Sequence, residues 1–168
     1  AAAHAVGAEG IGLYRTEFAF MVRESFPSEE EQLQLYRPML AAFAPRPVVM
    51  RTLDIGGDKT LPYFAIEENN PFLGWRGMRF TLDHPDIFLT QLRAMLRANA
   101  GLGNLRILFP MITTVEEVDE ALRLLARADR ELREDGYATT PPQVGVMIEV
   151  PSAAWQAEQL ARRVDYLS

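Results

Sequence analysis

The sequence predicts an α/β protein built on a parallel sheet, and two observations support this. Short apolar runs rich in branched residues alternate with longer stretches of helical periodicity along the 168 residues. Each apolar run is hydrophobic throughout, as strands of a parallel sheet are when both faces are covered. The pattern fits either a doubly wound sheet or a set of strands closed into a barrel.

Five runs are too short for helices and have the composition of strands. They are GIGLY (10–14), PVVM (47–50), LRILFPMI (105–112), QVGVMIEV (143–150) and VDYLS (164–168). Right-handed crossovers place the C-terminal ends of such strands at one edge of the sheet.

Helices are predicted between these runs. Ser28 and Glu31 stand in capping-box spacing, and so do Thr114 and Glu117, which predicts two helix starts. Ser152 directly follows a proline and is expected to cap the last helix. The expected helices are 28–43, 83–101, one from 114 that Gly136 ends, and one from 152 to about 163.

Composition narrows the functional class. With 48% hydrophobic residues, the chain can form a core of ordinary single-domain size, and no linker or repeat divides residues 1–168. The 17 basic and 23 acidic residues give a net charge of -6, which argues against nucleic acid or an anionic membrane as partner. The absence of cysteine excludes disulfides and thiolate metal sites within the chain and is compatible with a cytoplasmic location.

Charged side chains follow three of the predicted strands. GIGLY is followed by Arg15 and PVVM by Arg51, while QVGVMI leads into Glu149. Because parallel strands share their C-terminal edge, we expect these groups to line a common ligand site. A fourth charge, Arg76, lies in the irregular stretch NNPFLGWRGMR (69–79) and is expected to join them.

Arginines at such an edge suit an anion, because a guanidinium binds phosphate or carboxylate oxygens bidentately and stays charged in a dry site. Other interpretations stay open. A strand-end arginine could be solvated, or could pair with Glu17 or Asp54. Glu149 could form a buried salt bridge with an arginine, or could bind a hard cation such as Mg²⁺.

Two glycine-rich stretches do not match nucleotide-binding fingerprints. GAEGIG (7–12) lacks the required spacing and the preceding strand, and DIGGDKT (54–60) lacks the Walker spacing. The second stretch could still approach a phosphate through converging backbone amides. His4 and His84 have no partners that suggest catalysis, so we expect both to be structural.

Five stretches together resemble the phosphoenolpyruvate-binding domain of enzyme I, the phosphoenolpyruvate-protein phosphotransferase of the bacterial phosphotransferase system. They are GIGLYRTEFAFM (10–21), VVMRTLDIGGDKTLPY (48–63), NPFLGWRGMR (70–79), LRILFPMIT (105–113) and VGVMIEVPSA (144–153). Pyruvate phosphate dikinase shares the first and third stretches, but TLDIGGDK resembles enzyme I more closely. The longer wording from Asn70 to Ala98, with IEVP at 148–151, is similar to the nitrogen-related enzyme I.

The resemblance implies a substrate site. It makes Arg15 and Arg51 ligands of the phosphate of phosphoenolpyruvate, Arg76 a further substrate-binding residue, and Glu149 a Mg²⁺ ligand. In this family the phosphoryl group passes to a histidine on a separate domain and then to a phosphocarrier protein, and pyruvate is released. The intact relatives commonly form homodimers.

The resemblance also implies that the chain is part of a larger protein. The family domain is a (β/α)8 TIM barrel, and this chain supplies about five of its eight strands. The second metal carboxylate, the catalytic cysteine and the histidine-bearing domain are expected outside residues 1–168. We therefore expect no catalytic residue and no turnover in this chain alone, and we expect the incomplete sheet to self-associate.

Overall fold

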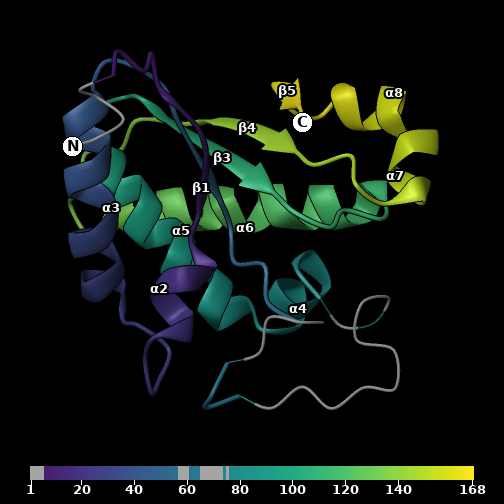
Figure 1. Cartoon of the computed structure of the whole chain (residues 1–168), viewed down its shortest axis with the longest axis horizontal. Coiled ribbons are helices and arrows are strands. Elements are labelled where there is room, and N and C mark those ends of the chain that lie inside the picture. The colour runs from purple at the N-terminus through teal and green to yellow at the C-terminus, as the bar shows by residue number, and fades with distance from the viewer. Residues whose placement is uncertain (1–5, 57–60, 65–73, 75) are drawn as a thin grey trace.

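One five-stranded parallel sheet forms the centre of the protein (Figure 1). The computed structural model describes residues 6–56, 61–64, 74 and 76–168. The strands are β1 (Ile11–Arg15), β2 (Val48–Arg51), β3 (Leu105–Phe109), β4 (Gln143–Val146) and β5 (Tyr166–Leu167), and their order in the sheet is their order in the sequence.

Seven helices occur in the described part of the chain. They are α2 (Glu17–Met21), α3 (Glu29–Phe43), α4 (Met78–Asp83), α5 (Pro85–Asn99), α6 (Val115–Glu134), α7 (Pro151–Trp155) and α8 (Ala157–Ala161). The sequence patterns did not predict α2 and α4. None of the described helices is long and apolar enough to cross a bilayer.

The sequential strand order identifies a segment of a barrel. A doubly wound sheet reverses its strand order so that helices cover both faces, whereas here β1 and β5 are the two edges of an unreversed sheet. The long helices pack in sequence, α3 on α5 and α5 on α6, along one face (Figure 1). The predicted partial (β/α)8 barrel is confirmed, and the sheet is not closed.

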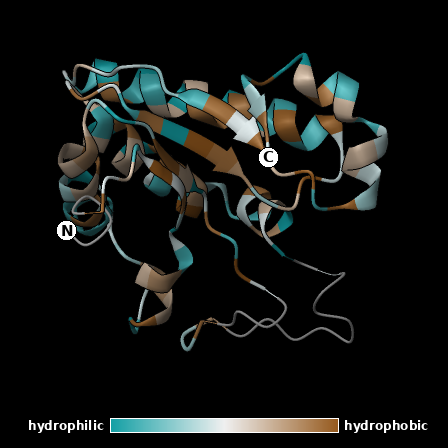
Figure 2. Cartoon of the chain, turned by 45° about the horizontal axis from the view of Figure 1, so that its top comes forward, coloured by the Kyte–Doolittle hydropathy of each residue, from teal (hydrophilic) through white to brown (hydrophobic). Residues whose placement is uncertain are grey.

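The core lies between the sheet and these helices. Every second strand residue points into it, and Figure 2 shows that the central strands are mainly hydrophobic. The core residues of β2, β3 and β4 are Val48, Met50, Leu105, Ile107, Phe109, Val144 and Val146. The opposite face is less covered at the edge strand β1, where Leu13 is 40% exposed. Coverage of both faces, which the apolar runs predicted, is therefore incomplete.

Three strands are shorter than the apolar runs that contain them, and one of these is β5, which covers Tyr166–Leu167 of the run 164–168. β3 stops at Phe109, because Pro110 cannot donate to the ladder and Met111 adopts a φ of 53°. β4 stops at Val146, so Glu149 lies in the following loop and not at the strand end. The sequence prediction of strands to 112 and 150 was wrong, since hydrophobicity continues past the last ladder bond.

The predicted helix caps are mostly confirmed. Ser28 and Thr114 each form both hydrogen bonds of a capping box, with Glu31 and Glu117 respectively. Gly136 follows α6 with a φ of 88°, as expected of a helix stop. Ser152 is the exception, because Pro151 occupies the first helical position and makes Val150 the N-cap. The last helix is also divided at Gln156 into α7 and α8.

The two serines provide a matched test of helix capping. We predict that Ser28→Ala lowers the free energy of unfolding by about 1 kcal/mol, because the Glu31 amide at the start of α3 loses its acceptor, the Ser28 hydroxyl. Ser152→Ala should change it by less than about 0.5 kcal/mol. Urea denaturation followed by circular dichroism measures both values, and equal effects would contradict the assignment of the caps.

Candidate functional site

A buried ion pair stands at the end of β2. The Arg51 residue is 5% exposed, and its Nη2 lies 2.5 Å from Glu17 Oε1 and 3.1 Å from Asp54 Oδ2. Glu17 begins α2 directly after β1, and Asp54 follows β2 by three residues, so one guanidinium joins two strand ends. The possibility that a strand-end arginine pairs with Glu17 or Asp54 is confirmed for Arg51.

Asp54 connects this ion pair to a second arginine. Its Oδ1 lies 3.4 Å from Arg76 Nε, while its Oδ2 contacts Arg51. The cluster therefore contains two guanidiniums and two carboxylates, and Asp54 is 1% exposed. Because Asp54 is shared, the positions of Arg51 and Arg76 are coupled, although 24 residues separate them in the sequence.

Gly77 allows the segment carrying Arg76 to approach the sheet. It has a φ of 56° and donates from its amide to Ile55 O at 3.0 Å. A Cβ at this position would lie 2.8 Å from Met111 Cβ and 3.2 Å from Asp54 Oδ1. Only glycine fits this conformation and this spacing without displacement of its neighbours.

Glu149, in the loop after β4, lies close to the segment that carries Arg76. Its Oε1 accepts a hydrogen bond from the Met111 amide at 2.8 Å, and the side chain is exposed at the surface. Arg76 and Glu149 line one cavity of about 200 Å³. The complete lining is Gly74, Arg76, Arg79, Met111, Glu149, Val150 and Pro151. Within the described residues Glu149 forms no ion pair, so the predicted alternative of a buried salt bridge does not hold there.

Arg15 lies at the same edge of the sheet. Its Cα is paired in register with that of Arg51, and its side chain is exposed. Residues paired in register on parallel strands project from the same face, so Arg15 and Arg51 project together. The sequence prediction that these two arginines share an edge is therefore confirmed, while their roles as ligands stay predictions.

The structure brings all four predicted residues to one end of the sheet. Arg51 and Arg76 meet on Asp54, Arg76 and Glu149 share a cavity, and Arg15 stands beside Arg51 in register. Sequence reasoning named Glu17 as a possible partner of a strand-end arginine, but it missed the roles of Gly77 and Met111. Nothing local to Met111 indicates its contact with Glu149.

Two buried donors of this edge lack a hydrogen-bond partner among the described residues. They are the Nε–H of Arg51 and the hydroxyl of Thr52. A buried unsatisfied donor carries a desolvation penalty, which an acceptor from a bound anion would remove.

The donor set for a metal ion is small. Among the described residues no group of three or more His, Asp or Glu side chains is arranged to hold a metal. Asp54 is engaged by two guanidiniums, which leaves Glu149 as the carboxylate facing the shared cavity. One carboxylate is compatible with Mg²⁺, because this ion is bound by one or two protein carboxylates together with substrate oxygens and water.

The sequence also contains two histidines and, in its second glycine-rich stretch, one lysine. Lys59 of the DIGGDKT stretch and His4 fall outside the described residues. The ring of His84 packs edge-on to Phe64 and tilted against Phe80, with centroid distances of 5.3 and 4.7 Å, which supports the structural role expected of it.

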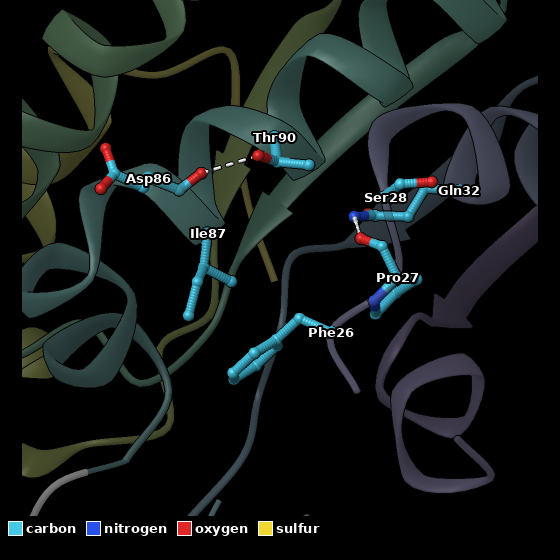
Figure 3. A pocket seen from close by; sticks show the side chains of 7 residues that line it. All are labelled: Phe26, Pro27, Ser28, Gln32, Asp86, Ile87 and Thr90. Carbon is cyan, nitrogen blue, oxygen red and sulfur yellow. Dashed lines mark hydrogen bonds between the residues drawn. The ribbon is translucent and has the colours of Figure 1, made fainter. Parts of the chain in front are cut away.

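A second cavity, of about 270 Å³, opens between the N-terminal ends of α3 and α5 (Figure 3). Its lining is Phe26, Pro27, Ser28, Gln32, Asp86, Ile87 and Thr90. It contains none of the four predicted site residues, so it does not belong to the charged edge, whereas the cavity lined by Arg76 and Glu149 does.

Comparison with known proteins identifies the family. The profile described as "PEP-utilising enzyme, PEP-binding domain" matches residues 1–168. The chain belongs to this family. The match covers every element that forms the charged edge.

Named relatives of this PEP-binding domain are bacterial. The chain is 58% identical over 161 residues to a "Phosphoenolpyruvate-dependent phosphotransferase system" protein of Salmonella typhimurium, covering 95% of the chain and 22% of that protein. It is 51% identical to a "Multiphosphoryl transfer protein" of Rhodobacter capsulatus, covering 96% of the chain and 19% of that protein. It is 50% identical to a "Phosphoenolpyruvate-protein phosphotransferase" of Staphylococcus carnosus, covering 96% and 28%. The chain thus spans about a fifth to a quarter of the length of these relatives.

The contact at Gly77 can be tested against a second glycine with positive φ. Gly101 has a φ of 74°, but a Cβ there would meet no atom within 4 Å. We predict that Gly77→Ala lowers the free energy of unfolding by about 2 kcal/mol more than Gly101→Ala does, because only the first adds overpacking to backbone strain. Chemical denaturation of both variants measures the difference. Equal losses would show that Gly77 is required for its dihedral angles alone.

Proposed function

We propose that this domain binds phosphoenolpyruvate and forms part of a phosphotransferase that passes its phosphoryl group to a histidine on another domain. From that histidine the group is transferred to a phosphocarrier protein, and pyruvate is released. Membership of the PEP-binding family and the printed names of the relatives support this proposal. These names favour a phosphotransferase over an enzyme of the pyruvate phosphate dikinase type.

The observation that carries the proposal is the convergence of three arginines on one end of the sheet. Arg51 and Arg76 are held by one buried carboxylate, and Arg15 stands in register with Arg51. Phosphoenolpyruvate presents a phosphate and a carboxylate, and guanidinium groups bind both bidentately. We assign Arg15 and Arg51 to the phosphate and Arg76 to a further contact with the substrate.

The geometry explains how such a site would assist phosphoryl transfer. Transfer of this group depends on positioning and on neutralising charge, and little covalent chemistry is required of the protein. Glu17 and Asp54 hold the Arg51 guanidinium in place before any substrate arrives. A donor fixed in advance does not have to reorganise when the charge develops, so its full interaction is available in the transition state.

Mg²⁺ is the cofactor that we propose for this site, with Glu149 as its protein ligand from this chain. When bound, the ion would supply positive charge next to the phosphate and enolate oxygens. The residues present supply one carboxylate of the kind that Mg²⁺ prefers. Glu149 itself is oriented by the Met111 amide, which fixes one carboxylate oxygen and turns the group toward the cavity.

Further parts of the proposal concern the whole protein. We propose a cytoplasmic enzyme that forms a homodimer, donates to a histidine phosphocarrier protein and belongs to the nitrogen-related branch. The catalytic residues lie outside this chain in that proposal. Isolated residues 1–168 should therefore bind phosphoenolpyruvate without converting it to pyruvate.

Calorimetric titration of the chain with phosphoenolpyruvate, in the presence of Mg²⁺, tests the substrate site. We predict that Arg15→Ala and Arg76→Ala each weaken binding about tenfold or more, because each removes a charge-assisted hydrogen bond to the ligand. Arg51→Lys keeps the charge that the buried carboxylates require and loses the bidentate geometry, so it should weaken binding similarly.

The matched control is Arg123→Ala, since Arg123 is an exposed arginine on α6. It should bind phosphoenolpyruvate as the unchanged chain does. If Arg15→Ala, Arg51→Lys and Arg76→Ala all retain the original affinity, the assignment of this edge as the substrate site is wrong.

A further inference from the structure

The buried side-chain amide of Gln91 contacts the residues that follow β1 and β2. Gln91, on α5, is 1% exposed, and its Oε1 accepts a hydrogen bond from the Leu53 amide at 2.8 Å. Its Nε2 donates to Thr16 Oγ1 at 3.1 Å. Thr16 follows Arg15, and Leu53 precedes Asp54, so a single carboxamide links the segments that carry the site residues of β1 and β2.

Thr16 extends this link to the backbone of Arg51 itself. Its hydroxyl is fully buried and donates to Arg51 O at 2.8 Å. The end of β1 is thus tied to the end of β2 by a side chain, beyond the last pair of the ladder at Arg15 and Arg51. This contact extends the attachment of the two strands past their ladder.

The second donor of Gln91 connects the site to α3. Gln91 Nε2 lies 3.3 Å from the Tyr36 hydroxyl, which donates to Gln32 Oε1 at 3.0 Å. Gln32 Nε2 then donates to Pro27 O at 3.0 Å, the contact drawn beside the cavity of Figure 3. Burial raises the pKa of Tyr36 well above its ordinary value, so its hydroxyl stays protonated and able to donate.

The direction of these bonds requires an amide at position 91. Its NH₂ group donates to two hydroxyls, and each hydroxyl must then donate onward, one to Arg51 O and one to Gln32 Oε1. A carboxylate of the same shape could accept from Leu53 but could not donate to either hydroxyl. The hydroxyls would turn toward it, and two buried acceptors would lose their donors.

We infer that Gln91 is a positioning residue for the phosphoenolpyruvate site, where its carboxamide fixes the ends of β1 and β2 against each other and thereby sets the distance between the Arg15 and Arg51 guanidiniums. Gln91 does not line the cavity that Arg76 and Glu149 share, so it acts through Thr16 and the backbone of Arg51. The inference rests on the proposed function, because it concerns how the same arginines reach their ligand.

Isosteric substitutions test this role. Thr16→Ser keeps the hydroxyl that joins Gln91 to Arg51 O, and Thr16→Val keeps the shape and removes it. We expect Thr16→Val and Gln91→Met each to weaken binding of phosphoenolpyruvate with Mg²⁺ about tenfold in calorimetric titration, and Thr16→Ser to bind as the unchanged chain does. Leu125→Ala, a core truncation on α6 outside this network, controls for general destabilisation and should leave the affinity unchanged.

A second measurement needs no ligand. The Arg51 Nε–H is buried, and its nitrogen-15 NMR resonance reports on the position of that guanidinium. The resonance should shift in Thr16→Val and Gln91→Met, and should stay in place in Thr16→Ser and Leu125→Ala. If Gln91→Met does not fold, the comparison of the two Thr16 variants still decides the outcome.

The outcomes separate the two proposals. Unchanged affinity and an unchanged resonance in Thr16→Val overturn the positioning role, and so does an equal loss of affinity in Leu125→Ala. If Arg15→Ala, Arg51→Lys and Arg76→Ala all leave phosphoenolpyruvate binding intact, the proposed function fails instead. The resonance shift then still reports whether Gln91 positions Arg51.

Discussion

The enclosure of Arg51 by Glu17 and Asp54 is the interaction on which the architecture of this edge depends. A guanidinium with 5% exposure is costly unless carboxylates and hydrogen bonds compensate its lost hydration. Glu17 follows β1 and Asp54 follows β2. Their ion pairs with Arg51 therefore hold these two segments together. Asp54 then needs Arg76 as a second partner, which brings the segment before α4 to the same place.

Topology explains why this enclosure lies at a site and not in the core. Because the strands are parallel and in sequential order, all loops that follow them open at one edge, and the helices occupy one face. The core positions of β2, β3 and β4 face the helices and need no polar side chain. The charged groups of the site lie at the C-terminal ends of the strands and in the loops that follow, where Arg51, the last residue of β2, meets carboxylates and Glu149 meets an amide. Along these strands, the residues that face the helices form the core, and the residues at the C-terminal ends form the candidate site.

The sequence predicted what is local and missed what is not. Capping boxes at Ser28 and Thr114 were predictable, since both partners lie within one turn. The apolar runs between helices predicted a parallel sheet but left its strand order open, and only the family resemblance implied a barrel segment. The position of Glu149 was not, because β4 ends at Val146 and a non-local bond from Met111 orients the carboxylate. Pro151 shifted the N-cap to Val150, which a rule based on Ser152 alone could not detect. One non-local feature was predicted, because parallel strands share an edge, namely the convergence of Arg15 with Arg51. The ion pairing of Arg51 was one of several open alternatives.

A double-mutant cycle between Arg51 and Glu17 tests the central interaction most directly. The free energy of unfolding is measured for the unchanged chain, for Arg51→Met, for Glu17→Met and for the variant that carries both. We predict that the two losses are strongly non-additive, with a coupling of about 2 kcal/mol or more, because either single change leaves a buried charge without its partner. Losses that add to within about 0.5 kcal/mol would contradict the claim that this ion pair holds the ends of β1 and β2 together.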